Sequence, residues 1–115
     1  MTAARGHALQ AAFADYLAGF IPTARNAPKN VRRGAAKVDI TGTPGFVFEV
    51  KTPRDFRPTE WAQQARGYVK SNELPIVIYF PERIGAGSVD DSIAMLPTGE
   101  LMKLLAESGR IPPPF

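Results

Sequence analysis

The stretch that decides the fold is Lys37-Val-Asp-Ile-Thr-Gly-Thr-Pro-Gly-Phe-Val-Phe-Glu-Val-Lys51. In its second half, three apolar residues alternate with Val47, Glu49 and Lys51, and side chains two positions apart in a strand lie on the same face. This alternation predicts a strand over 46–51 that presents Glu49 and Lys51 together and keeps its other face wholly apolar.

The first half predicts a second strand, over 36–41, with Asp39 between two apolar neighbours. Residues 42–45, Gly-Thr-Pro-Gly, favour a tight hairpin between the two strands. If the strands pair through this turn, Asp39 lies beside Glu49. Two carboxylates and an ammonium then share one end of a small sheet.

The rest of the chain predicts three helices, two more strands and a basic loop. Apolar spacing and capping signals place helices over 3–20, over 60–70 with Thr59 as N-cap, and over 98–108 with Gly109 beyond its end. An apolar, β-branched run predicts a buried central strand over 75–80, and a short strand is expected over 92–96. Residues 22–36 are expected to form a loop. We therefore predict one α/β domain over residues 1–115, an α-β-β-α-β core with a mixed central sheet flanked by helices, and a Pro-rich tail over 110–115.

Composition excludes several kinds of protein. A chain of 115 residues is long enough for one modest core. The absence of cysteine excludes disulfides, thiolate zinc sites and cysteine nucleophiles, and the single histidine, His7, excludes a His-rich metal centre. No apolar run approaches the ~18 residues that a membrane span needs, and the first residues lack a signal peptide's pattern. We expect a soluble, intracellular domain.

Charge is distributed unevenly along the chain. Residues 1–37 carry six basic side chains and a single acidic one, Asp15, whereas residues 38–115 carry eight basic and ten acidic side chains. This asymmetry favours a polyanionic partner for the first third of the chain. The alternative is a solvated loop that is merely basic.

The expected cluster of Asp39, Glu49 and Lys51 suits metal-assisted hydrolysis of a phosphodiester. Carboxylate oxygens suit hard cations such as Mg²⁺ or Mn²⁺, which stabilise charge on a phosphate and lower the pKa of an attacking water. A neighbouring lysine stabilises the negative charge that develops. Taken alone, Glu-x-Lys on a strand is usually a solvated face, so the prediction depends on Asp39 and the hairpin.

Asp39, nine further residues and then Glu49-Val50-Lys51 resemble the core signature of the PD-(D/E)XK nuclease superfamily. The expected order of elements is also that of its restriction-endonuclease-like fold, and the resemblance covers about Arg5 to Phe80. It implies that Asp39, Glu49 and the backbone carbonyl of Val50 ligate a metal ion, Mg²⁺ or Mn²⁺, and that Lys51 is catalytic.

The crossover helix of many such nucleases carries Gln-x-x-x-Tyr, and Gln64-Ala-Arg-Gly-Tyr68 fits that pattern, with both side chains on one helix face. The resemblance implies that Gln64 is catalytic and that Tyr68 contacts DNA. Alternatively, Tyr68 packs with Trp61 on the sheet and Gln64 is merely exposed.

The first helix departs from the family pattern. Many relatives place a glutamate there, where this chain has the neutral Gln10. Some relatives use a histidine of that helix instead, which makes His7 a candidate metal ligand. The alternative is that His7 is simply exposed to solvent.

In this resemblance the basic residues flank the site and contact DNA phosphates, which makes binding salt-dependent without reading sequence. The candidates are Arg5, Lys29, Arg32, Arg33, Lys37, Arg54 and Arg57. No base-reading motif is recognisable, which favours structure-selective or nonspecific cutting.

The small size, Trp61 before Gln-Gln-Ala and the Leu-rich last helix look most like small phage Holliday junction resolvases. This resemblance implies a Mg²⁺-dependent endodeoxyribonuclease that cuts branched DNA as a homodimer, in the cytoplasm of a bacterial or phage-infected cell, with no membrane partner. The alternatives are an exonuclease or general repair nuclease of the same fold, and an inactive DNA-binding relative, which Gln10 favours.

Overall fold

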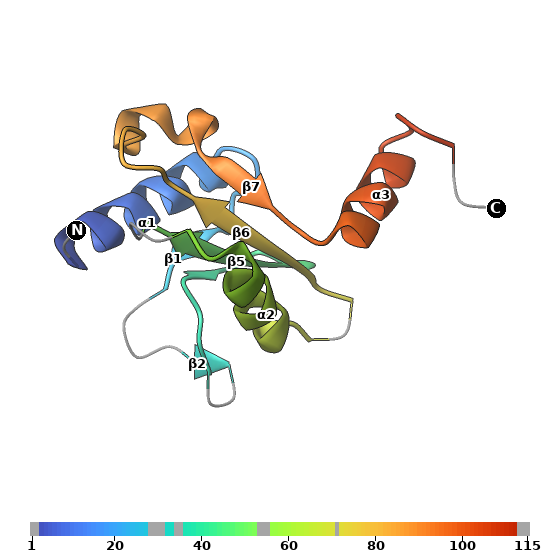
Figure 1. The fold of residues 1–115 in the computed structure, drawn as a ribbon, viewed down its shortest axis with the longest axis horizontal. Helices are drawn as coiled ribbons and strands as arrows, with labels where there is room; N and C mark the ends of the chain where they lie inside the picture. Colours follow the sequence, from blue (N-terminus) through green and yellow to red (C-terminus); the bar gives the residue numbers. More distant parts are fainter. Residues whose placement is uncertain (1–2, 28–31, 34–35, 53–55, 71, 113–115) are drawn as a thin grey trace.

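The computed structural model describes residues 3–27, 32–33, 36–52, 56–70 and 72–112. The elements are α1 (Ala3–Ala18), β1 (Arg25–Asn26), β2 (Arg32–Arg33), β3 (Ala36–Lys37), β4 (Ile40–Thr41), β5 (Phe46–Lys51), α2 (Pro58–Tyr68), β6 (Leu74–Tyr79), a 3₁₀ helix (Ala86–Asp91), β7 (Ile93–Met95) and α3 (Thr98–Glu107). They form one α/β domain with a mixed sheet and helices, which confirms the expected class (Figure 1). Among the described residues, no helix has the length and apolarity needed to cross a membrane.

The central sheet has the strand order β5-β6-β7. β5 runs parallel to β6, with Phe46 opposite Leu74 and Lys51 opposite Tyr79, and β7 runs antiparallel to β6. Parallel strands need a crossover connection, which α2 supplies. Five of the six residues of β6 are buried, as the apolar run predicts for a central strand.

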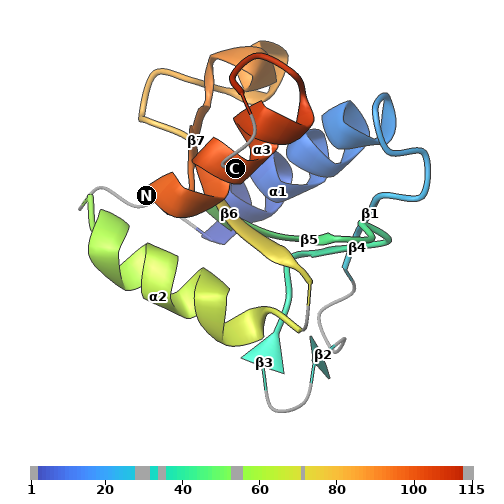
Figure 2. The ribbon, with the colours of Figure 1, turned by 90° about the vertical axis from the view of Figure 1, so that its right-hand side faces the viewer.

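The two faces of the sheet are covered by different helices (Figure 2). On one face, Phe48 and Ile78 pack in a cluster with Leu9 and Phe13 of α1. On the other face, the smaller cluster contains Val77 and two side chains of α2, Trp61 and Ala65. The alternation of β5 therefore turns its apolar side towards α1 and leaves Glu49 and Lys51 on the side of α2.

The expected hairpin between 36–41 and 46–51 is wrong. Instead, β4 pairs antiparallel with β1, and β3 pairs with β2, so the expected loop 22–36 contains two short strands. The residues on both sides of β1 are bonded to the segment 39–42, because Thr23 Oγ1 donates to the carbonyl of Gly42 at 2.6 Å and Ala27 N–H donates to the carbonyl of Asp39 at 2.9 Å. These contacts hold the segment 39–42 against β1 rather than in a ladder with β5.

Several helix ends also differ from expectation. α1 ends at Ala18 rather than residue 20, and Phe20 beyond it is 71% exposed. α2 begins at Pro58 with Arg57 as N-cap, so Thr59 lies inside the helix rather than capping it. Proline suits the first turn because its missing N–H is not needed there. α3 ends close to its predicted boundary, and Gly109 beyond it has a φ of +80°.

The close approach of the Thr23 segment to Gly42 is testable by substitution. Gly42 has a φ of +74°, and a Cβ there would lie 1.9 Å from the carbonyl oxygen of Thr23. We expect Gly42→Ala to lower the free energy of unfolding more than Gly45→Ala, measured by urea denaturation. Gly45 has a φ of +87° and open space around it, so its substitution costs only the left-handed strain of about 1–2 kcal/mol. Equal losses in the two variants would contradict the observed packing.

Candidate active site

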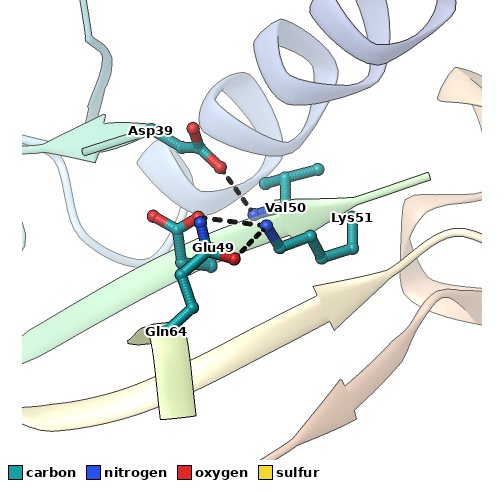
Figure 3. Close-up of polar contacts among 5 residues, drawn as sticks. All are labelled: Asp39, Glu49, Val50, Lys51 and Gln64. Atoms are coloured by element: carbon teal, nitrogen blue, oxygen red, sulfur yellow. Dashed lines mark hydrogen bonds and ion pairs between the residues drawn. The ribbon is translucent and has the colours of Figure 1, made fainter. Parts of the chain in front are cut away.

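Four polar side chains from three segments of the chain converge beside the sheet (Figure 3). Glu49 and Lys51 project from β5, Asp39 precedes β4, and Gln64 projects from α2. Lys51 Nζ lies 3.8 Å from Glu49 Oε2 and donates a hydrogen bond of 2.6 Å to Gln64 Oε1. The structure thus brings together the four residues that the sequence nominates as catalytic.

Asp39 is held from both its side chain and its backbone. Its Oδ2 accepts a hydrogen bond of 2.9 Å from Val50 N–H, and its carbonyl accepts one of 3.0 Å from Gln10 Nε2. Gln10 Nε2 also donates to Asn26 Oδ1 at 2.9 Å, so one side chain of α1 connects both segments of the β1–β4 pair. Asp39 therefore lies next to Glu49 although the expected hairpin is absent from the described pairings.

Glu49 is the buried carboxyl of the group, with 3% of its surface exposed. Its Oε1 is buried and has no hydrogen-bond partner among the described residues, which is unusual because buried polar atoms are nearly always paired. Burial and the negative charge of Asp39 raise the pKa of Glu49 to about 8, while the ammonium of Lys51 acts in the opposite direction. Burial and the charge of Asp39 thus penalise a charged Glu49 unless a further positive charge is added.

The oxygen atoms of this site fit a hard divalent cation. The carbonyls of Gly45 and Lys51 accept hydrogen bonds from the β6 side of the sheet, so Val50 presents its own N–H and C=O to the opposite edge, where Asp39 lies. Two carboxylates and the Val50 carbonyl then supply the oxygen ligands that Mg²⁺ or Mn²⁺ prefers. The described residues contain no cluster of three or more histidine, cysteine or acidic side chains, so a cation here would depend on that carbonyl.

The two candidates on α1 occupy different positions. Gln10 bonds to the backbone of Asp39, whereas His7 is exposed. Gln10 is therefore a positioning residue for Asp39, a role that sequence reasoning missed together with its partner Asn26. No local signal marks Asn26, because its place is set by the tertiary contact. The role of His7 as a metal ligand stays a prediction.

The basic candidates are scattered around the site. Arg5 Nη2 donates to the carbonyls of Pro81 and Ile84, each at 3.1 Å, so its guanidinium fastens the start of α1 to the loop after β6. Arg57 is exposed and lies 3.5 Å from Glu60. A DNA contact by either residue stays a prediction.

The remaining DNA-binding candidates are located by their backbone or lie outside the described residues. Arg32 pairs with Lys37 in the β2–β3 ladder, next to Arg33, and Tyr68 is the last residue of α2. Lys29 and Arg54 lie outside the described residues.

No protein-family model matches this chain, and no curated protein or solved structure is significantly similar to it. The functional argument therefore depends on the geometry and chemistry of the site.

The raised pKa of Glu49 predicts how stability changes with pH in the absence of divalent cations. The folded protein retains a proton that the unfolded chain releases above pH 4.5, so stability falls as pH rises from there to about 8. We expect the thermal midpoint in chelator to fall across this window, and Glu49→Gln to reduce the fall. Glu60→Gln, which removes an exposed carboxylate, is the matched control and should leave the slope unchanged. Identical slopes for all three proteins would contradict the raised pKa.

Proposed function

We propose that the protein is a metal-dependent endonuclease that hydrolyses DNA phosphodiester bonds and belongs with the PD-(D/E)XK nucleases. The observation that carries the proposal is the buried Glu49 carboxyl, with an unpartnered oxygen, between Asp39 and Lys51. A buried charge is costly unless it is paired or coordinates a metal. A divalent cation would supply the missing partner and offset the repulsion between the two carboxylates.

Each residue has a role in this chemistry. Asp39, Glu49 and the Val50 carbonyl would hold the cation, which supplies charge stabilisation at the phosphate and a more acidic water. Lys51 places its ammonium at the edge of this site, with 18% of its side chain exposed, where it can stabilise the negative charge of the reacting phosphate. Gln64 accepts a hydrogen bond from Lys51 and thereby orients that ammonium.

The order of elements supports a restriction-endonuclease-like core. α1, the Asp39 segment, β5, the crossover helix α2 and the buried β6 follow one another as in that fold. The segment of Asp39 meets β5 through the Asp39–Val50 hydrogen bond rather than through a ladder, which is a departure from the expected hairpin. The two carboxylates and the lysine still lie together at one end of β5, which is what the chemistry needs.

Cleavage assays on three substrates test this function: a four-way junction, a linear duplex and a single strand, each with Mg²⁺ and with chelator. We expect Glu49→Gln and Lys51→Ala each to slow cleavage by about 100-fold or more, since either removes charge stabilisation at the reacting phosphate. Asp90→Asn and Lys70→Ala, which alter exposed side chains with no role in the site or at α3, are matched controls and should cleave normally.

The outcomes of this assay separate the alternatives. Paired nicks near the branch support junction resolution, whereas digestion from ends supports an exonuclease or repair nuclease. Unaltered cleavage by both site variants would contradict the site. Binding of DNA by a wild-type protein that never cleaves it would instead support an inactive DNA-binding relative.

Cutting two strands of a junction requires two active sites, so the proposal includes a homodimer. α3 offers a surface for it, because none of its ten residues, all of them described, is buried, and Leu101 and Met102 are 37% and 42% exposed. Figure 1 shows α3 at one end of the domain, beyond β7. A two-fold axis at α3 would bury the same apolar surface of both copies.

The dimer is tested by sedimentation equilibrium. We expect the wild-type protein to sediment at twice the 12.5 kDa of the chain, and the double variant Leu101→Glu, Met102→Glu to sediment as a monomer, because buried charges oppose the contact. Phe20→Glu, which changes an exposed side chain after α1, is the control and should remain dimeric. A monomeric wild-type protein would contradict the proposal.

A further inference from the structure

Three aromatic rings from separate segments pack against one another in a cluster beside the candidate site, with Phe56 edge-on to Trp61 and the other two pairs tilted. The ring centroid of Phe56 lies 5.1 Å from that of Tyr79 and 5.4 Å from that of Trp61, and the Trp61 and Tyr79 rings are 5.2 Å apart. Trp61 is 5% exposed, whereas Phe56 is 55% exposed. The aromatic cluster therefore has one buried ring, that of Trp61, and one ring that faces solvent, that of Phe56.

The aromatic cluster lies on the same face of the sheet as the candidate catalytic residues. Tyr79 is the register partner of Lys51, so their Cα atoms sit on adjacent strands about 5 Å apart and their side chains point to the same side. Trp61 and Gln64 are one turn apart on α2, and one touches Tyr79 while the other bonds to Lys51. The exposed ring of Phe56 thus packs against a side chain of the strand adjacent to that of Lys51.

Single exposed apolar side chains are common and by themselves mean little. Phe56 differs because two neighbouring rings fix its orientation, so a partner that stacks on it does not have to immobilise it. Phe56 is also the one large apolar side chain among residues 56–60, which are all exposed. A single ring on the face of the candidate site matches one planar base in size.

We propose that Phe56 is a stacking platform for an unpaired DNA base next to the phosphate that is cleaved. This inference rests on the proposed nuclease function and adds to it a preference for branched DNA. Bases in an intact duplex are already stacked on their neighbours, whereas those at a branch or in a single strand can turn onto an aromatic ring. Arg57 follows Phe56 in an exposed position, 3.5 Å from Glu60, and adds a positive charge next to the ring. The platform therefore favours branched DNA over uninterrupted duplex.

The test measures DNA binding in chelator, where it does not depend on cleavage. Fluorescence anisotropy compares a four-way junction with a linear duplex of equal length. We expect Phe56→Ala to weaken junction binding by about tenfold, the range for loss of one base–aromatic stack, and to change duplex binding by less than about twofold. Phe56→Trp should retain junction binding, because it keeps a flat aromatic face.

Two further variants separate stacking from structure. Phe56→Leu keeps an apolar contact with Trp61 but has no aromatic face, so it should weaken junction binding as Phe56→Ala does. Trp61 is the only tryptophan of the wild-type chain, so its emission reports whether the aromatic cluster is intact in the Phe56→Ala and Phe56→Leu variants. Phe20→Ala is the matched control, since Phe20 is also an exposed ring packed on a tyrosine, Tyr16, but follows the far end of α1.

A 2-aminopurine at the branch point gives a direct readout, because its fluorescence falls when it stacks. We expect the 2-aminopurine fluorescence to be quenched on binding to the wild-type protein and to Phe56→Trp, but not on binding to Phe56→Leu. Equal junction binding by wild-type protein and a folded Phe56→Leu variant would overturn the platform while leaving the nuclease proposal intact. An equal loss on junction and duplex would also overturn it. A wild-type protein that neither binds nor cleaves DNA would instead overturn the proposed function.

Discussion

The hydrogen bond between Val50 N–H and Asp39 Oδ2 connects the first third of the chain to the edge of the sheet that carries the candidate site. β4 pairs with β1, so this bond takes the place of a strand ladder beside β5. In this bond one carboxylate oxygen of Asp39 serves the fold, and the bond also fixes that carboxylate next to Glu49. Fold and site therefore share one interaction, and Gln10 strengthens it by holding the carbonyl of Asp39.

Because Asp39 is fixed next to Glu49, the charged form of the Glu49 carboxyl is disfavoured. The strand buries this carboxyl, Asp39 adds a like charge, and Lys51 at 3.8 Å compensates only in part. A domain selected for stability alone would place an apolar residue or a satisfied polar group there. Violations of this kind concentrate at functional sites, where a ligand resolves them. The conflict is thus an argument for a bound cation that does not depend on any resemblance.

The parts of this structure that sequence predicts are those with a clear period. Alternation in β5 places Glu49 and Lys51 on one face, the unbroken apolar run gives the buried β6, and the crossover helix between them follows. β1 and β4 have two residues each, and two residues contain no period. Their pairing is decided by tertiary contacts, such as the one between Thr23 and Gly42, that no local pattern records.

Site residues can be predicted only where a strand period or a motif spacing marks them. Asp39, Glu49, Lys51 and Gln64 carry motif spacing, and the structure brings them together. No sequence motif marks the aromatic cluster of Phe56, Trp61 and Tyr79. Its only sequence signal is Phe56, a large apolar residue in a polar stretch after β5, and its meaning depends on the register that places Tyr79 opposite Lys51.

The parallel register also explains why the polar and aromatic groups lie at one edge of the sheet. Lys51 and Tyr79 are the last residues of β5 and β6, and ligands of open α/β sheets bind at the carboxyl ends of parallel strands. Across this edge the order is Asp39, then Lys51, then Tyr79 with the tilted ring of Phe56 packed against it. In the proposed function, a DNA strand crossing the sheet would meet the cation ligands first, the ammonium next and the exposed ring last. That order places the phosphate over the oxygen ligands and its base over the ring, so a nucleotide that can leave its stack fits both at once.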